Sequence, residues 1–308
     1  MRWPIPQKLF QGISTEADKL RADAELNQER CKIKEAELTT MISVLNLGSI
    51  DYAMGLRLQN KLIALRKEGR IADLLLLLEH TPVITLGRNA KPTNILASLD
   101  LLKHRGVEVF DCDRGGDVTF HGPGQLVAYP IFDLRGFPAE NGKRRTLGAI
   151  EYVRRLEAVL IRTCADFRIP VERVKGLTGV WTAPAGGATG TSPVALQAKI
   201  AAIGVHISRA VTSHGFALNV NTDLSYFDLI VPCGITQKPV TSMQKELGHT
   251  LPLEDVGHSV ARNFGHVFSS HVLWLESLDA LFDEKVGVPA HPPQELRRLH
   301  GDDDTHWA

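Results

Sequence analysis

The sequence has no excess of charge, no long apolar run and no recognisable targeting segment. Its 35 Lys and Arg residues balance 35 Asp and Glu residues, so net charge gives no basis for nucleic-acid or membrane binding. The longest apolar run, the leucines of 74–78, is far too short to span a bilayer. The first twelve residues lack the apolar core of a signal peptide, and the seven acidic residues within 1–40 are untypical of a mitochondrial transit peptide. We therefore expect a cytoplasmic protein.

Motifs for common cofactors are also missing. The four cysteines, Cys31, Cys112, Cys164 and Cys233, form no C-x-x-C pair, which argues against a zinc knuckle or a thioredoxin-like site. The chain contains no phosphate-binding G-K-S/T sequence and no G-x-G-x-x-G that joins a strand to a helix. No internal repeat is visible. The sequence thus predicts no metal site and no nucleotide-binding loop, and in a reducing compartment its thiols should be free.

The chain is long enough for one large domain or two ordinary ones, with 308 residues of which 44% are hydrophobic and 23% charged. Residues 14–38 are rich in Ala, Glu, Lys and Arg with few large apolar residues, and we therefore expect residues 1–40 to form a polar extension that is helical or flexible. We expect the main folded domain over 41–272. A C-terminal tail, 273–308, should be partly disordered because of its Pro-rich and Asp-rich end.

Strands outnumber helices within 41–272. Helical spacing of apolar residues predicts helices at 51–67, at 146–167 with Thr146 as N-cap, and at 253–268. Strands are predicted on both sides of a turn at 80–82, between two glycine turns in 106–134, and as a hairpin of 197–208 with 211–221. Many short turns between strands favour an α+β fold, with a mostly antiparallel mixed sheet flanked by helices.

The stretch RGGDVTFHGPGQ, residues 114–125, contains four glycines, a proline, an arginine and a histidine. Glycine clusters let the backbone approach a ligand closely, but they also simply form turns. Arg114 and His121 make a pocket wall plausible. A plain glycine-rich hairpin is an equally good interpretation from these residues alone.

Lys199 begins a second unusual stretch, KIAAIGVHI. Strict strand alternation would place Lys199 on one apolar face with Ala201, Ile203, Val205 and Ile207. A buried ammonium group is costly unless it is paired, so this lysine either has a chemical role or reaches water from the strand end. The small residues of 201–204 leave room for a ligand beside the strand.

Cys233 lies between Pro232 and Gly234 at the end of the apolar run LIVPCGI. A free thiol has a pKa near ~8.5, so a nucleophilic cysteine needs a cation or a base nearby. Pro232 fixes the backbone before the thiol, and the amides after it could form an oxyanion site. An ordinary cysteine at a strand end is the alternative. Cys164 falls on the apolar stripe of the helix at 146–167 and is interpreted as a buried structural thiol.

Three stretches together resemble the signature blocks of the lipoyl(octanoyl) transferases, in that family's order: RGGDVTFHGPGQLVAYPIFDL, KIAAIGVHISR and TSHGFALNVNTDLSYFDLIVPCGI. The resemblance covers most of 43–270. It implies the catalytic fold of the lipoate and biotin protein ligases, and transfer of an octanoyl or lipoyl group from acyl carrier protein to a lysine of lipoyl domains. The implied acceptors are the E2 subunits of 2-oxoacid dehydrogenases and the glycine cleavage H protein. We further expect a monomer without a cofactor, since the phosphopantetheine arrives on the carrier protein.

The same resemblance implies the roles of individual residues. Cys233 would carry the acyl group as a thioester, and Lys199 would lower the pKa of that cysteine or act as a base. The substrate-binding residues implied are Arg114, Gly115, Gly116, Asp117, Val118, Thr119, Phe120, His121, Ala202, Ile203, Gly204, Gly215, Phe216 and Ala217. The region between Trp181 and Lys199 is longer and richer in small residues than the resemblance leads us to expect. We predict that the loop of 183–195 is mobile.

Three alternatives remain compatible with the sequence. An ATP-dependent lipoate-protein ligase of the same fold would need groups for an adenylate and would have no use for a nucleophilic Cys233. A non-catalytic module that binds acyl carrier protein or lipoyl domains would tolerate the loss of Cys233. A cysteine hydrolase would pass the acyl group to water, so a lipoyl-domain acceptor would not change its rate.

Overall fold

The structure, a computed structural model, describes residues 40–138, 144–183, 197–232 and 238–282. Four of the expectations above concern residues outside these ranges: the extension over 1–39, the loop over 184–196, Cys233, and the tail from 283 onward. Within the described ranges, no helix is both long and apolar enough to cross a membrane.

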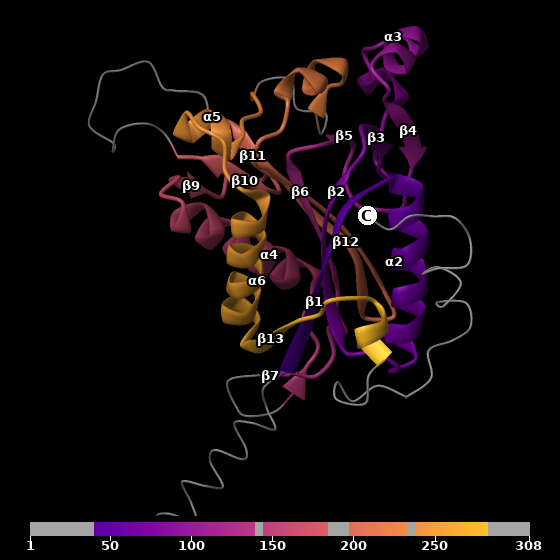
Figure 1. Cartoon of the computed structure of the whole chain (residues 1–308), viewed down its shortest axis with the longest axis vertical. Coiled ribbons are helices and arrows are strands. Elements are labelled where there is room, and N and C mark those ends of the chain that lie inside the picture. Colours follow the sequence, from indigo (N-terminus) through magenta and orange to yellow (C-terminus); the bar gives the residue numbers. More distant parts are fainter. Residues whose placement is uncertain (1–39, 139–143, 184–196, 233–237, 283–308) are drawn as a thin grey trace, which may run out of the picture. The chain divides into compact units, whose positions relative to one another are not determined.

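An eight-stranded sheet forms the centre of the described structure (Figure 1). In spatial order its strands are β13 (Ser270–Trp274), β1 (Thr40–Ile50), β2 (Asp73–His80), β6 (Gln125–Ile131), β12 (Val211–Asn219), β11 (Lys199–Ser208), β10 (Val180–Thr182) and β9 (Val171–Glu172). β1 and β2 are parallel, whereas every neighbouring pair from β2 to β9 is antiparallel. The predicted α+β fold with a mostly antiparallel mixed sheet is confirmed.

A smaller sheet stands beside the main one. It consists of β4 (Glu108–Asp111), β3 (Val83–Leu86) and β5 (Val118–His121) in that order. Short helices accompany it: η1 (Pro92–Asn94), α3 (Leu99–His104) and η2 (Leu224–Leu229). Both strands predicted around the turn at 80–82 exist, but β2 and β3 lie in different sheets rather than forming a hairpin. A third, two-stranded sheet pairs β7 (Phe137–Pro138) with β8 (Arg144–Arg145).

Helices cover both faces of the main sheet (Figure 1). On one face lies α2 (Tyr52–Lys67), which begins at the N-cap Asp51, whose side chain accepts a hydrogen bond from the amide of Met54. On the other face lie α4 (Ala149–Asp166) and α6 (Leu253–Phe268), which pack against each other. The short helices α5 (Met243–Leu247) and η4 (Asp279–Phe282) complete the described chain.

The start of α4 differs from the prediction. The N-cap is Gly148 and not Thr146, and no side chain caps the first amides. Leu147, which precedes the N-cap, is already buried, so the chain reaches the core before the first turn of α4. Ile150, in the first turn of the helix, is 80% exposed, whereas Tyr152 and Val159 are buried.

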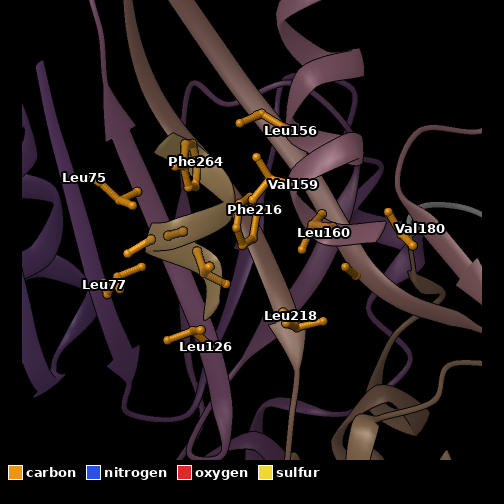
Figure 2. Close-up of a cluster of buried hydrophobic side chains, with 14 of the residues drawn as sticks. Leu75, Leu77, Leu126, Leu156, Val159, Leu160, Val180, Phe216, Leu218 and Phe264 are labelled. Atoms are coloured by element: carbon orange, nitrogen blue, oxygen red, sulfur yellow. The ribbon is translucent and has the colours of Figure 1, made fainter. Parts of the chain in front are cut away.

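The largest core cluster lies between the sheet and the two helices α4 and α6 (Figure 2). The cluster includes Leu75 and Leu77 of β2, Leu126 of β6, Phe216 and Leu218 of β12, Val180 of β10, Leu156, Val159 and Leu160 of α4, and Phe264 of α6. Cys164 is fully buried in this cluster, and burial raises the pKa of its thiol to about 12. The interpretation of Cys164 as a structural thiol agrees with this position.

A second core cluster fills the α2 face, and it reaches further along the chain than the predicted domain. The boundary predicted at residue 272 falls inside β13. Beyond it, Leu278 and Leu281 are buried in the α2-face cluster together with Leu58 and Leu62. The described fold therefore continues to Phe282, because these two leucines close the core that α2 begins.

Replacing Leu281 by alanine tests this boundary. Deleting a buried leucine side chain leaves a cavity, so we expect Leu281→Ala to lower the free energy of unfolding by about 2–5 kcal/mol. The matched control Leu273→Ala, in a side chain that is 37% exposed, should change it by no more than about 0.5 kcal/mol. Urea unfolding of both variants measures the difference. Equal values would mean that the chain beyond 272 adds nothing to the fold.

Candidate active site

A pocket opens between the main sheet and the loop that precedes β5. It encloses about 490 Å³ of space, which includes its open mouth and the gaps between its lining atoms. The lining residues are Tyr52, Arg114, Gly115, Gly116, Asp117, Thr119, His121, Val127, Tyr129, Ala202, Ile203, Gly204, His214, Gly215, Phe216 and Ala217. All three stretches that the sequence singled out thus contribute to one pocket.

The floor of the pocket is made of small residues on adjacent strands. Ala202 of β11 pairs with Ala217 of β12, which in turn pairs with Val127 of β6. Two residues further along, Gly204 pairs with Gly215. A Cβ added to Gly215 would lie 2.1 Å from the carbonyl oxygen of Ala128 in β6, so no larger residue fits there. The sheet therefore forms a shallow trough at this point instead of presenting side chains.

The loop of 114–117 crosses over this trough. The amide of Gly115 donates to the carbonyl of Val205 at 3.0 Å, and a Cβ on Gly204 would approach the Gly115 carbonyl oxygen to 2.8 Å. On its other side the loop is anchored by Arg114, whose guanidinium donates to the carbonyl and hydroxyl oxygens of Thr85 at 2.7 and 2.9 Å. Backbone contact with β11 and a buried arginine thus hold the roof of the pocket.

The strand β5 turns only alternate residues toward the pocket. Thr119 and His121 line it, as the resemblance implied. Val118 and Phe120 do not: both are buried in a third core cluster on the opposite face, where Phe120 stacks on Tyr226 at a ring distance of 4.6 Å. The side chains of Val118 and Phe120 thus face away from the pocket, since side chains of a strand alternate between two faces. Substrate binding by the block of 114–121 stays a prediction.

Buried imidazoles stand at one side of the pocket in their neutral form. His121 donates from Nδ1 to Gln125 at 2.7 Å, and burial lowers its pKa to about 3, with His80 and Arg114 adding to the effect. His80 donates from Nδ1 to the carbonyl of Ile50 and accepts at Nε2 from the hydroxyl of Tyr129 at 2.7 Å, and burial lowers its pKa to about 4. Neutral rings suit a pocket for an uncharged ligand, because they add no charge that would need solvation.

Four lining residues were not identified from the sequence: Tyr52, Val127, Tyr129 and His214. His214 is the least expected, because alternation would place it with Phe216 and Leu218 in the core. Its backbone has φ 55°, in the left-handed region, and its amide donates to the side chain of Gln59. This local reversal turns the imidazole toward Tyr129, at a ring distance of 6.3 Å. The only feature of the sequence that hinted at this position of His214 was the glycine that follows it.

Asp113 holds His214 from behind. The Nε2 atom of His214 donates to one carboxylate oxygen of Asp113 at 2.6 Å, and His206 donates to the other. Burial alone would raise the pKa of Asp113, but these two hydrogen bonds bring it below its usual value. Burial lowers the pKa of His214 more than the Asp113 carboxylate raises it. Within the described ranges, no cluster of His, Cys, Asp or Glu has the arrangement of a metal site.

Lys199 lies on the pocket side of the sheet because of a β-bulge. The register between β10 and β11 shifts by one residue at this point, and both Ile200 and Ala201 pack into the core against α4. The alternation that predicted a common face for Lys199 and Ala201 is therefore broken. Lys199 pairs with Trp181 of β10. The Nζ atom of Lys199 lies 4.7 Å from the centroid of the Trp181 ring. The ammonium group is thus placed over an indole ring, which stabilises a cation.

The segment that follows Cys233 pairs with Lys199. The amide of Lys199 donates to the carbonyl of Pro239 at 2.8 Å, and the amide of Thr241 donates to the carbonyl of Lys199 at 2.9 Å. Pro232 and Lys238, the described residues on either side of 233–237, line one open surface hollow. Cys233 itself lies outside the described residues. Its neighbours on both sides nevertheless lie at one surface, next to the start of β11.

Sequence comparison finds close relatives over most of the chain. Residues 51–265 match the model of the lipoyl protein ligase A/B catalytic domain. The octanoyltransferase of Koribacter versatilis is 63% identical over 85% of this chain and 98% of that protein. The octanoyltransferase of Acidobacterium capsulatum is 58% identical over 79% of this chain and 97% of its own, and that of Solibacter usitatus is 52% identical over 76% and 96%.

Comparison of structures finds the same fold at low sequence identity. The bi-partite lipoate protein ligase of Thermoplasma acidophilum superposes with a TM-score of 0.57 at 14% identity, over 77% of this chain and 87% of that one. A lipoate-protein ligase A bound with ATP gives a TM-score of 0.55 at 14% identity, over 76% and 87%. These similarities confirm the expected ligase-like fold.

The depressed pKa values of His80 and His121 predict acid sensitivity. In the unfolded chain both imidazoles should bind a proton near pH ~6.5, whereas in the folded chain they do so only near pH 4 and 3. The unfolded state binds more protons in between, so stability should fall as pH falls below ~6.5, by about 1.4 kcal/mol per pH unit for each histidine. Urea unfolding at pH 7, 6 and 5 measures this slope.

His121→Asn should remove one of the two contributions to that slope, whereas the control His104→Asn, in an exposed side chain, should retain both. Because the slope is compared within each variant, its absolute stability does not matter. Identical slopes in the wild type and in His121→Asn would exclude His121 as a buried neutral group.

Proposed function

The chain belongs to the lipoyl protein ligase A/B catalytic-domain family and is an acyltransferase, and we propose that it transfers an octanoyl or lipoyl group from acyl carrier protein to a lysine of a lipoyl domain. The octanoyltransferases to which it is 52–63% identical support the octanoyl group and the transfer reaction. The acceptors proposed are the lipoyl domains of 2-oxoacid dehydrogenase E2 subunits and the glycine cleavage H protein.

The observation that carries the proposal is the shared face of Lys199 and the trough. Ala202 is the nearest pocket residue on β11, and because of the bulge it lies about two regular strand steps, or ~7 Å, from Lys199. A linear acyl chain lying on the small residues Ala202, Gly204, Gly215 and Ala217 would thus point its carbonyl end toward Lys199. The chain segment of Cys233 returns to the sheet at the same lysine.

In the first step, the thiolate of Cys233 attacks the thioester carbon of the octanoyl group on the phosphopantetheine arm. A sulfur–carbon bond forms to Cys233 while the bond to the phosphopantetheine sulfur breaks. The proton that the Cys233 thiol loses goes to the departing phosphopantetheine thiolate, so carrier protein leaves as a free thiol. Lys199 favours this step because a cation or base next to a cysteine increases the thiolate fraction.

In the second step, the neutral amine of the acceptor lysine attacks the thioester on Cys233. A carbon–nitrogen bond forms, the carbon–sulfur bond breaks, and the proton lost by the amine returns through Lys199 to the Cys233 sulfur. A thioester is converted into a more stable amide, so the proposed reaction needs no ATP, metal ion or other cofactor. Turnover without ATP distinguishes this activity from that of an ATP-dependent lipoate-protein ligase.

Incubation with octanoyl-acyl carrier protein should add one octanoyl group to the enzyme, measured as intact mass. Because Cys233 is the proposed attachment site, Cys233→Ala should show no such gain. The matched control Cys112→Ala should still become acylated, since Cys112 hydrogen-bonds the carbonyl of Leu86 in the small sheet and lines no part of the pocket. Acylation of Cys233→Ala would reject the thioester intermediate at this residue.

Replacing Lys199 should change how readily Cys233 reacts. We expect Lys199→Met to move the pH dependence of Cys233 alkylation by iodoacetamide upward, toward the ~8.5 of an isolated thiol. Lys199→Arg should restore little, because a guanidinium group cannot act as a base and needs more space.

A control for general electrostatics is Lys238→Met, which removes a second ammonium group 5.3 Å from the same Trp181 ring. Its alkylation profile should stay close to that of the wild type. An unchanged profile in Lys199→Met would remove Lys199 from the mechanism, and equal shifts in both variants would make it a bulk charge effect.

A further inference from the structure

The positions of the lining residues along β11 give the length of the pocket, measured from Lys199. On β11 the lining begins at Ala202 and ends at Gly204. Because the bulge makes Lys199 and Ala201 face adjacent residues of β10, Gly204 lies about four regular strand steps, or ~13 Å, from Lys199. An extended octanoyl chain is about as long as three strand residues, roughly 10 Å. If its carbonyl lies between Lys199 and Ala202, as the proposed function requires, its methyl end lies near Gly204 and Gly215.

Two large side chains stand at that end of the pocket. Tyr129 is the next residue of β6 on the same face as Val127, and His214 precedes Gly215 on β12. Both are 5% exposed or less. They follow a floor made of alanines, glycines and Val127, so the trough changes from smaller to larger residues at the level of Gly204.

Both side chains are fixed from behind by hydrogen bonds. The hydroxyl of Tyr129 donates to His80, which is itself anchored on the carbonyl of Ile50. His214 donates to Asp113, and the same carboxylate accepts from His206, which shares the face of Gly204 on β11. Asp113 immediately precedes the roof loop, which is tied to β11 at Val205. A wall held in this way cannot move aside for a longer ligand without losing these contacts.

We propose that Tyr129 and His214 form an end wall that limits acyl length at eight carbons, with Asp113 as the positioning residue that keeps His214 in place. This inference rests on the proposed function, because it takes the acyl carbonyl to lie on the Lys199 side of the pocket. A chain longer by two methylenes would meet the two rings, whereas a shorter chain would leave part of the trough empty.

A competition experiment tests the wall directly. Equal amounts of octanoyl and decanoyl thioesters of acyl carrier protein are offered together with a lipoyl domain, and mass spectrometry gives the ratio of decanoyl to octanoyl product. Because both donors compete for the same enzyme molecules, this ratio does not depend on the fraction of a variant that folds. Rates with a single donor would not have this property.

His214→Gly removes the ring and suits the left-handed backbone at this position. We expect it to raise the decanoyl to octanoyl ratio about ten-fold or more, the usual discrimination by a pocket between chains that differ by one or two methylenes. Asp113→Ala should raise the ratio in the same direction but less, about three-fold, since the ring stays but loses its anchor. The control Asp111→Ala, an exposed carboxylate two residues away, should leave the ratio unchanged.

An unchanged ratio in both His214→Gly and Asp113→Ala, whatever their total activity, would overturn the inference and leave these residues a purely structural role. If His214→Gly does not fold, the ratio in Asp113→Ala decides, because that side chain is 57% exposed and its loss creates no cavity. A wild-type enzyme that transfers neither acyl group would instead reject the proposed function.

Discussion

Close approach of backbone to backbone at Gly204 and Gly215 is the constraint on which the pocket depends. The hydrogen atom of Gly215 faces the carbonyl of Ala128, where a Cβ would lie at 2.1 Å, and Gly204 lies directly under the carbonyl of Gly115. Side chains at either position would lift the roof loop or push β6 and β12 apart. Since the loop also carries Arg114 and follows Asp113, the same two glycines determine where both groups stand. The trough exists because side chains are missing at this point in the sheet.

The polar groups around the trough are arranged so that little charge reaches it. The guanidinium of Arg114 donates to the carbonyl and hydroxyl of Thr85 and to the carbonyl of Gly115, which keeps its donors occupied within the roof. His80 and His121 are neutral because burial disfavours their charged forms. An apolar chain can therefore enter without displacing solvated charges. The cation that the proposed chemistry needs, Lys199, lies beyond Ala202 over the indole of Trp181.

The sequence predicted the elements of this fold better than their relations. Periodicity placed α2 and α6 correctly because each has an apolar stripe at helical spacing, and the two apolar runs on either side of residues 209–210 placed the hairpin of β11 with β12. The bulge at Ile200 could not be predicted, since an alanine-rich run gives no signal for which of two neighbours faces the core. The left-handed backbone of His214 was equally hidden, because the glycine after it suggested a turn rather than a reversed side chain. Local sequence patterns indicate which residues belong to one helix or strand. The face of the sheet toward which Ile200 and His214 point depends instead on contacts with β10, β6 and α2.

The β-bulge at the start of β11 and the left-handed residue His214 of β12 lie at the two ends of the pocket floor, and each turns a side chain toward the pocket. The bulge at the start of β11 turns Lys199 to the pocket face, and the left-handed His214 turns a ring to the same face where β12 begins to pair with β6. Between them the strands are regular, and a regular strand has a fixed rise per residue. The distance from Lys199 to His214 is therefore determined by the number of residues between the two irregularities. The backbone of the hairpin thus fixes the length of the pocket. Selectivity for the length of an acyl chain then requires only that Lys199 and His214 stay in place.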